Sequence, residues 1–332
     1  MLRMGLIGGG RIGRLHAYNL KRYFADRVLI THVYDPFIDD DWAAENELVV
    51  CDSVDALLNE AISAVLICSP SNEHVSQIIA AAENNKSIFC EKPIGLEIKE
   101  IQQAIDVTAK AGVLLQVGFN RRFDPSFAAL KNRMDAEVGQ PQLIKITSRD
   151  PHCPPERYIA HSGGIFLDMS IHDFDMARFL AQSEVKTVYA TGSCLINPSF
   201  KQHDDIDTAV IQLKFKNGAL AVIDNSRQAV YGYDQRIEVF SNKAALKADN
   251  KRAHHVEFYG SDEVKEAVFE NFFLERYKEA YINQFSAFFA AIENQLPSAV
   301  SGFDGLAAVE IAKAARKSWQ SGQAVSLSEH MD

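Results

Sequence analysis

The first third of the chain alternates short apolar runs with longer segments in which apolar residues recur every three or four positions. The apolar runs predict strands at 4–7, 28–34, 64–68, 87–90 and 113–118. The longer segments predict helices at 11–24, 73–83 and 97–111. Strands that are apolar throughout are buried on both faces, so the pattern predicts an α/β domain with a doubly wound parallel sheet, over residues 1–120.

The pattern changes after residue 120. Helices are predicted at 125–134 and from about 165 to 180, with a strand at 142–148, and several alternating strands follow. Asn217-Gly218 predicts a hairpin, because both residues tolerate positive φ. Two helices close the chain, and the first, at 268–295, carries aromatic residues at helical spacing that are expected in the core. Residues 121–332 are therefore predicted to form an α+β domain with a large, mostly antiparallel open sheet.

Composition narrows the classes of function. The 332 residues carry a formal net charge of -10, which argues against binding to a phosphate backbone because such binding depends on dense positive charge. No apolar stretch approaches the roughly 18 residues needed to cross a bilayer. The five cysteines are scattered and never spaced as Cys-x-x-Cys. We expect a cytoplasmic protein that binds neither nucleic acid nor membrane.

A glycine-rich motif directly follows the first predicted strand and opens the first predicted helix: Gly8-Gly9-Gly10-Arg11-Ile12-Gly13. In a Gly-x-Gly-x-x-Gly turn, Gly8 allows the tight turn, Gly10 lets the backbone approach a pyrophosphate, and Gly13 lets the helix pack on the strand. The amino end of the helix offers free N–H groups to phosphate. This context predicts a Rossmann dinucleotide site.

Asp35 ends the second predicted strand, about twenty residues beyond the glycines. A carboxylate there accepts hydrogen bonds from ribose hydroxyls and repels a 2′-phosphate, which predicts NAD as the cofactor. The alternative is a glycine turn in a fold that binds no nucleotide, with Asp35 as a strand cap. Strand, glycines, helix and acid together favour the first interpretation.

Two further segments carry candidate chemistry. Glu91-Lys92-Pro93 follows a buried strand at the carboxyl end of the predicted sheet, where ligands bind in open α/β folds. The proline makes a cis peptide bond an option. Lys92 could equally be a surface lysine.

The second segment is the helix predicted from about 165 to 180. Helical spacing places His172 on its apolar side, with Asp168 one turn before and Asp175 one turn after. Nearby carboxylates raise the pKa of an imidazole and burial lowers it, a balance that suits a general base near neutral pH. A core histidine is the alternative. Asp150, His152, Cys153 and His161 match no common zinc spacing, and no metal site is predicted.

With these motifs, the chain resembles the glucose–fructose oxidoreductase/inositol dehydrogenase/rhizopine catabolism family from residue 4 to about 318. The Glu-Lys-Pro element is typical of the whole family. Three other segments resemble the inositol branch of the family more specifically: Gly118-Phe119-Asn120-Arg121-Arg122-Phe123-Asp124, Ser148-Arg149-Asp150-Pro151 and Asp168-Met169-Ser170-Ile171-His172-Asp173-Phe174-Asp175.

The resemblance implies NAD-dependent oxidation of myo-inositol to 2-keto-myo-inositol (scyllo-inosose) by a homotetramer. It implies that Lys92, Asp168 and His172 form a catalytic triad with His172 as general base. It further implies cofactor contacts at Ser69, Asn72, His74, Glu91 and Lys92, beside those at Gly8, Gly10, Arg11, Ile12, Gly13 and Asp35. Arg122, Asp150, Asp175 and Tyr231 are the candidates for contacts with the other hydroxyls of the polyol.

Other functions stay open at this point. The same chemistry could act on scyllo-inositol or on an aldose such as glucose, because hydroxyl geometry in a pocket decides specificity. The family also contains non-catalytic NAD-binding regulators and NAD-assisted glycosidases. The intact set of Lys92, Asp168 and His172 favours an enzyme, because a regulator needs no group for proton transfer.

Overall fold

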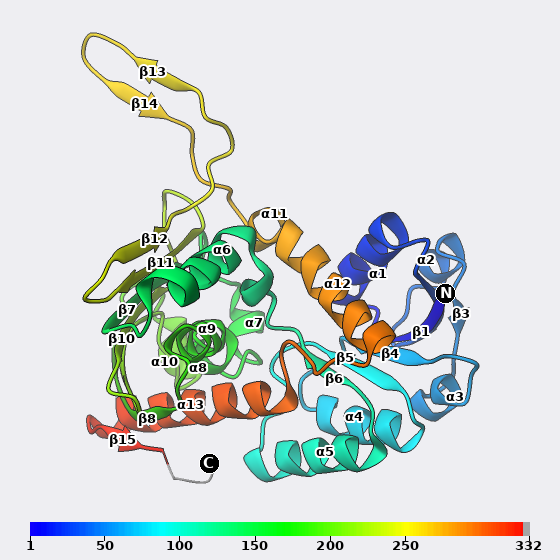
Figure 1. The fold of residues 1–332 in the computed structure, drawn as a ribbon. Coiled ribbons are helices and arrows are strands. Elements are labelled where there is room, and N and C mark those ends of the chain that lie inside the picture. Colours follow the sequence, from blue (N-terminus) through cyan, green and yellow to red (C-terminus); the bar gives the residue numbers. More distant parts are fainter. Residues whose placement is uncertain (328–332) are drawn as a thin grey trace. The chain divides into compact units, whose positions relative to one another are not determined.

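The computed structural model describes residues 1–327 (Figure 1). The chain forms two compact units, each described by itself below. The first consists of Met1–Asn120 with Tyr281–Val309, and the second consists of Arg121–Ala280 with the chain from Glu310 onward.

The first unit is built on a six-stranded parallel sheet in the order β3-β2-β1-β4-β5-β6. This is the strand order of the Rossmann fold. Its strands are β1 (Leu2–Ile7), β2 (Val28–Tyr34), β3 (Val49–Val50), β4 (Ala64–Ile67), β5 (Ser87–Cys90) and β6 (Leu115–Val117). Its complete helices are α1 (Arg11–Tyr23), α2 (Asp40–Glu45), α3 (Val54–Leu58), α4 (His74–Glu83) and α5 (Ile98–Ala111).

The first unit also includes most of helix α12 (Lys278–Asn294), which belongs to this unit from Tyr281 onward. Phe285, Phe288 and Phe289 of this helix are buried in the same core as Phe89 of β5. The ring centroids of Phe89 and Phe285 lie 4.6 Å apart. The predicted aromatic core is confirmed for Phe285 and Phe288, whereas Phe272, which was also expected there, is 37% exposed. The predicted helix at 268–295 starts too early, because residues before the short α11 (Phe273–Arg276) are not helical. Helix α13 (Gly302–Ser321) follows and passes from the first unit into the second.

The second unit contains a seven-stranded mixed sheet in the order β12-β11-β7-β10-β9-β8-β15. All of its described pairs are antiparallel except β7 with β10, so the prediction of a mostly antiparallel sheet is confirmed. The predicted hairpin at Asn217-Gly218 joins β9 to β10, with Gly218 at φ +91. The strands are β7 (Leu143–Arg149), β8 (Val185–Ser193), β9 (Thr208–Phe215), β10 (Leu220–Ser226), β11 (Asp234–Phe240), β12 (Ala245–Ala248) and β15 (Val325–Ser326).

Helices lie along one face of this sheet, where α9 contacts β7 (Figure 1). Residues of β9 and β10 alternate between buried and exposed positions, as expected of a sheet with one open face. A separate hairpin of β13 (Glu257–Tyr259) and β14 (Val264–Glu266) projects from the rest of the second unit (Figure 1). The helical segments are η1 (Asn120–Phe123), α6 (Pro125–Arg133), η2 (Met134–Val138), α7 (Glu156–Ile159), α8 (Ile165–Asp168), α9 (Ile171–Ala181) and α10 (Ser199–Gln202).

Candidate active site

The glycine loop between β1 and α1 has the backbone geometry that the sequence predicts. Gly8 has φ +97, and a Cβ there would lie 2.5 Å from the backbone of Cys68 and Ser69. A Cβ on Gly13 would lie 2.0 Å from the carbonyl oxygen of Gly8, so only glycine lets the helix approach the loop this closely. A Cβ on Gly10 would meet nothing within 4 Å. The open side of the loop therefore lies at Gly10, where a pyrophosphate would approach the helix terminus at Arg11 and Ile12.

Asp35 immediately follows β2 and is bound to the glycine loop. Its Oδ2 accepts a hydrogen bond from the N–H of Gly9 at 2.7 Å, and its Oδ1 accepts one from the N–H of Phe37 at 2.8 Å. The carboxylate is thus fixed beside the loop, as a ribose-binding acid of a Rossmann fold must be. The glycines and Asp35 together fit NAD.

The residues expected near the nicotinamide end of the cofactor form a connected set. His74 starts α4, is 1% exposed, and has both ring nitrogens on backbone carbonyls: Nδ1 lies 2.7 Å from the oxygen of Pro93 and Nε2 lies 2.9 Å from that of Ser69. Burial lowers the pKa of His74, against the effect of these carbonyls. Because its ring contacts the carbonyls of Ser69 and Pro93, buried His74 packs between the loops after β4 and β5. The hydroxyl of Ser69 donates to Gln77, and the Asn72 side chain donates to Glu73.

Glu91 and Lys92 directly follow β5, and the Lys92–Pro93 peptide bond is cis. Oε1 of Glu91 lies 2.7 Å from Nε2 of His16, a fully buried residue of α1, and Oε2 accepts from the Lys92 N–H at 3.2 Å. This connection links the helix of the glycine loop to the backbone at Lys92. Sequence reasoning missed His16, although Gly13, His16, Ala17 and Leu20 recur at helical spacing and are all buried.

In the second unit, the single helix predicted from about 165 to 180 is wrong. The structure has two helices, α8 and α9, separated at Met169 and Ser170. Ser170 explains the break, because its N–H donates to the carbonyl of Ile165, five residues back, and its hydroxyl donates to Oδ1 of Asn225 at 2.5 Å. His172 is therefore in the first turn of α9 and Asp168 is at the end of α8.

The apolar side predicted for this segment is buried at Ile165, Met169 and Met176, but it is not the only buried side. Helix α9 is buried on nearly every side, and its buried residues include Asp173 and Asp175 as well as Phe174 and Met176. His172 itself is half-buried. Because acids share the interior with apolar side chains, each buried acid needs a partner.

Asp168 and Asp150 share one such partner, which sequence reasoning missed. Arg227 donates from Nη2 to Oδ2 of Asp168 at 2.9 Å and from Nη1 to Oδ2 of Asp150 at 3.3 Å. The Tyr158 hydroxyl donates to Oδ1 of Asp168 at 2.8 Å. Burial raises the pKa of Asp150, and Asp168 adds to that rise while Arg227 opposes it. Burial and the charge of Asp168 raise the pKa of Tyr158 as well.

Arg122 and Asp175 form a bidentate pair. Nε of Arg122 lies 2.9 Å from Oδ2 of Asp175, and Nη2 lies 2.6 Å from Oδ1. The Arg122 guanidinium also lies over the ring of Phe179, 4.9 Å from its centroid. Arg121 is paired with the buried Asp173 at 2.5 Å. The two adjacent arginines therefore serve two different acids of α9.

Tyr231 is placed differently from the other predicted substrate residues. Its hydroxyl donates to Oδ2 of Asp234 at 2.6 Å and accepts from Nη1 of Arg149 at 2.9 Å, and its side chain is exposed. The structure thus connects Asp150 with Asp168 and Arg122 with Asp175, while Tyr231 belongs to the group formed by Arg149 and Asp234.

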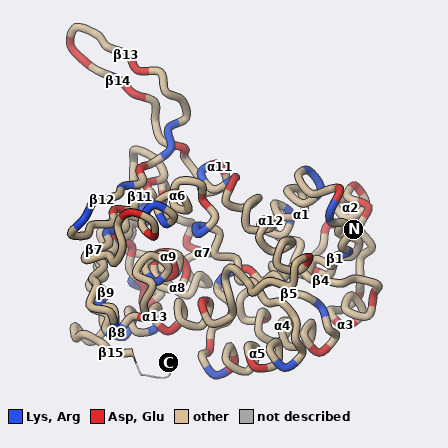
Figure 2. The backbone as a smooth tube through the Cα atoms, viewed as in Figure 1, with Lys and Arg blue, Asp and Glu red and all other residues tan. Residues whose placement is uncertain are grey.

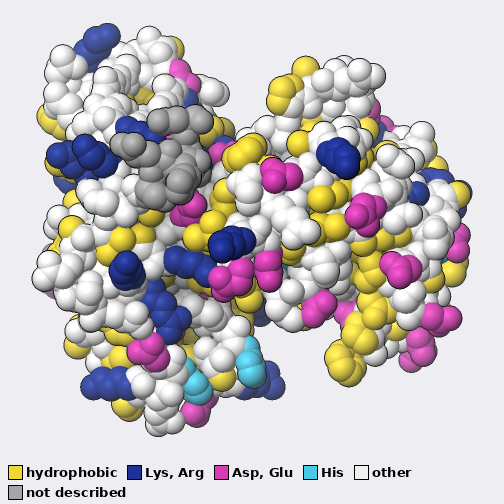
Figure 3. Space-filling view, turned by 90° about the horizontal axis from the view of Figure 1, so that it is seen from below, with side chains coloured by type: hydrophobic (Ala, Val, Ile, Leu, Met, Phe, Trp, Pro, Cys, Tyr) yellow, Lys and Arg dark blue, Asp and Glu magenta, His cyan; other side chains and the backbone are white. Residues whose placement is uncertain are grey.

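Among residues 1–327, no cluster of three or more His, Cys, Asp or Glu side chains could hold a metal ion, and no helix is long and apolar enough to cross a membrane. Acidic and basic positions are scattered over both units (Figure 2), and the face shown in Figure 3 carries side chains of both signs.

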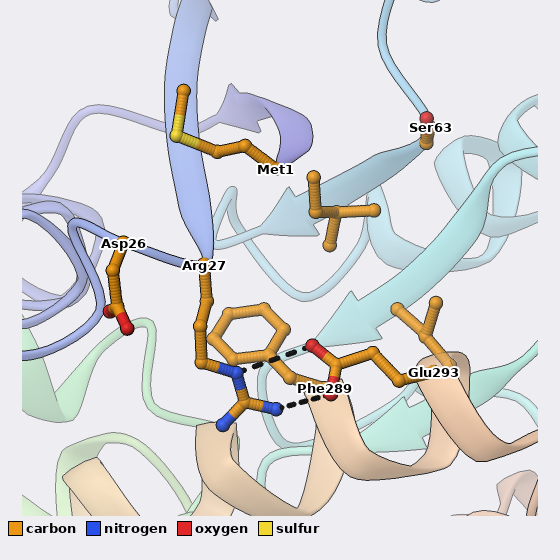
Figure 4. A pocket seen from close by; sticks show the side chains of 8 residues that line it. Met1, Asp26, Arg27, Ser63, Phe289 and Glu293 are labelled. Carbon is orange, nitrogen blue, oxygen red and sulfur yellow. Dashed lines mark hydrogen bonds and ion pairs between the residues drawn. The ribbon is translucent and has the colours of Figure 1, made fainter.

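A hollow of about 410 Å³ lies in the first unit, lined in part by Arg27, Ser63 and Glu293 (Figure 4). Arg27 donates to Glu293 there at 3.2 and 2.8 Å. Arg27 precedes β2 and Ser63 precedes β4, so the hollow lies at the amino ends of the strands. Dinucleotides bind at the opposite, carboxyl ends. This hollow is therefore separate from the glycine loop.

The parallel sheet, the glycine loop and the anchored Asp35 define a dinucleotide-binding protein with a Rossmann fold. Residues 2–119 match the model of the oxidoreductase family with an NAD-binding Rossmann fold, and residues 127–247 match the GFO/IDH/MocA C-terminal domain. The chain belongs to the GFO/IDH/MocA family, and it is an NAD-dependent dehydrogenase.

Three similar proteins extend this result. An uncharacterized oxidoreductase of Bacillus subtilis is 48% identical, with 99% of this chain and 97% of that protein covered. The myo-inositol 2-dehydrogenase of Thermotoga maritima is 44% identical, with 99% of each chain covered. The crystal structure of scyllo-inositol dehydrogenase from Lactobacillus casei, with bound NAD(H) and scyllo-inositol, is 28% identical, with a TM-score of 0.90 and with 98% of this chain and 99% of that chain covered.

Proposed function

We propose that this dehydrogenase oxidises myo-inositol to 2-keto-myo-inositol (scyllo-inosose) with NAD. One observation carries the choice of a neutral polyol: three arginines of the second unit, with side chains 8% exposed or less, are paired with acids. Arg121 is paired with Asp173, Arg122 with Asp175, and Arg227 with both Asp150 and Asp168. An anionic substrate such as a hydroxy acid needs the positive charge of an arginine, and carboxylates already neutralise these three.

The paired groups suit a ring of hydroxyls. A carboxylate offers about four lone-pair positions and a guanidinium offers five N–H donors, so a pair keeps hydrogen-bonding capacity after its charges cancel. Arg122, Asp150, Asp175 and Tyr231 are our proposed contacts to the hydroxyls that do not react. The named activity of the Thermotoga maritima relative supports the same substrate class.

The roles of the reacting groups follow from their chemistry. His172 takes the proton of the hydroxyl that is oxidised, and Lys92 stabilises the negative charge that develops on that oxygen. Asp168 orients the substrate and favours the protonated imidazole of His172. When bound, NAD supplies the nicotinamide ring that accepts the hydride. The glycine loop from Gly8 to Gly13 and Asp35 hold its phosphates and ribose, and Ser69, Asn72, His74 and Glu91 shape the nicotinamide end.

Oxidation of scyllo-inositol is the second candidate, because the similar protein of Lactobacillus casei is a scyllo-inositol dehydrogenase. Initial rates with myo-inositol, scyllo-inositol, glucose and lactate, each with NAD and with NADP, test the proposal. We expect the highest kcat/KM for myo-inositol with NAD and no turnover of lactate. A preference for lactate or another anionic substrate would refute the argument from paired arginines.

We also propose a homotetramer assembled through the second unit. The open face of its sheet exposes Val210, Leu220, Val222 and Phe240, and exposed apolar groups gathered on one face are typical of an interface. The two-stranded β13–β14 hairpin exposes Val256, Phe258, Tyr259 and Val264, and so small a hairpin is marginal alone in water. Sedimentation of the wild type and of Val222→Lys tests this: we expect a tetramer that the substitution dissociates, and a monomeric wild type would refute it.

The proposed setting is cytoplasmic, which the five free thiols support.

A further inference from the structure

Asp150 and Arg227 directly follow two neighbouring strands, which place these residues side by side. Strands β7 and β10 are parallel, and their register pairs Arg149 with Ser226. Asp150 and Arg227 are the next residues along each strand, so they leave the same end of the sheet on neighbouring strands. Backbone bonds fix both positions, because Asp150 N–H donates to Ser226 and Arg227 N–H donates to Asp207.

The side chain of Arg227 is 4% exposed, and it reaches two acids that come from different elements. Asp150 follows β7, whereas Asp168 ends α8. The planar guanidinium uses separate nitrogens for the two carboxylates, Nη1 for Asp150 and Nη2 for Asp168. A planar fork of this kind fixes the direction of each oxygen, which the point charge of a lysine does not.

The charges around this cluster show that the Arg227 cation offsets the repulsion between two acids. Asp150 and Asp168 repel one another, and Arg227 and the buried Arg121 favour the charged form of Asp150. Tyr158 donates to Asp168, and Asp205 also lies within the field of Arg227. His172 follows Asp168 by four residues. Burial lowers the pKa of Arg227, but Asp168 and Asp150 raise it more, so the guanidinium stays protonated.

We propose that Arg227 is a positioning residue that holds Asp150 and Asp168 as a pair of anionic acceptors for neighbouring hydroxyls of the polyol. This inference rests on the proposed function, since it assigns the two acids to the substrate. Arg227 acts through the acids and does not react. The fixed separation of the two carboxylates would then contribute to the choice between inositol isomers, which differ only in hydroxyl direction.

Two variants of the full-length protein test this inference. Arg227→Gln removes the charge, and Arg227→Lys keeps the charge without the fork. Arg178→Gln is the matched control, because Arg178 makes a partly buried bidentate pair with Glu184 near the other end of α9, with contacts of 2.8 and 2.6 Å.

For Arg227→Gln we expect the KM for myo-inositol to rise roughly tenfold or more, the size of a lost charge-assisted hydrogen bond. The acidic limb of the kcat/KM profile should move to higher pH, because acids without the cation ionise less readily. Arg227→Lys should restore the acidic limb but not the KM, and it should reduce the preference between myo-inositol and scyllo-inositol. NADH binding should stay unchanged in every variant.

A folded Arg227→Gln with the KM and pH profile of the Arg178→Gln control would overturn the inference. If Arg227→Gln does not fold, Arg227→Lys decides, and a wild-type KM and isomer preference there would overturn it.

A wild type that oxidises no inositol would refute the proposed function instead. The thermal stability of both Arg227 variants would then test the cluster alone. Stability of Arg227→Gln should fall more steeply than that of the wild type as pH rises from 5 to 8, and parallel curves would refute the cluster.

Discussion

Replacement of Asp35 tests the assignment of NAD as the preferred cofactor. Asp35→Asn keeps the size and one acceptor oxygen of the side chain and removes its charge. Asp35→Ser removes the charge and most of the reach. In the structure the two carboxylate oxygens accept from the N–H groups of Gly9 and Phe37, so both variants disturb the glycine loop to different extents.

The expected magnitudes follow from these contacts. Two unit charges about 5 Å apart repel by roughly 3 kcal/mol at an effective dielectric constant of about 20, and salt weakens this further. Loss of the Asp35 charge should therefore reduce the preference for NAD over NADP by about tenfold to hundredfold. Asp35→Ser also leaves two N–H groups without their acceptor. Because water can replace part of the lost hydrogen bonds, the expected loss of stability is only about 1–2 kcal/mol.

The assay is kcat/KM for NAD and NADP at saturating polyol, with unfolding by denaturant measured in parallel. Asp41→Asn is the control, because Asp41 is an exposed acid on α2 with the same change in charge. We expect the control to keep the wild-type preference. An unchanged ratio of NAD to NADP in both Asp35 variants would refute the ribose contact, and a wild type that prefers NADP would refute the choice of cofactor.

Three further predictions follow from other residues. His172→Ala should lower kcat by roughly 100-fold or more with unchanged NADH affinity in fluorescence titrations, because the imidazole acts on the substrate proton; near-normal turnover would end that assignment. Gly13→Ala should abolish NADH binding, since its Cβ would meet the Gly8 oxygen at 2.0 Å, and normal affinity would contradict the packing argument. The pKa of His74 is lowered in the fold, so the unfolded chain takes up a proton at a higher pH than the folded protein does. The free energy of unfolding should therefore decrease as pH falls below about 6.5, by at most about 1.4 kcal/mol per pH unit. Thermal unfolding of His74→Gln should lack this component, and equal slopes would refute it.

The sequence predicted the first unit well because its signals are local. Continuous apolar strands, the glycine turn and Asp35 are each readable within a few residues, and all of them occur where expected. The contribution of α12 to the same core could not be read from the chain, since a run of aromatic residues does not indicate which sheet it covers.

The second unit was harder to predict because its site depends on pairing between distant segments. Asp168 and His172 were found from their spacing on one helix, but Ser170 interrupts that helix through bonds that spacing does not reveal. Arg227 was missed because its place beside Asp150 requires the parallel pairing of β7 and β10, which are separated in the chain by β8 and β9.

Hydride transfer itself is the most direct test of the central claim. The protein is incubated with NAD and myo-inositol carrying deuterium at C2, and the nicotinamide product is analysed by mass spectrometry. We predict NADH with one deuterium from the substrate carbon, and the same labelled product formed at least about 100-fold more slowly by His172→Ala. Reduced cofactor without the label, or no reduced cofactor despite normal NADH binding, would contradict the account.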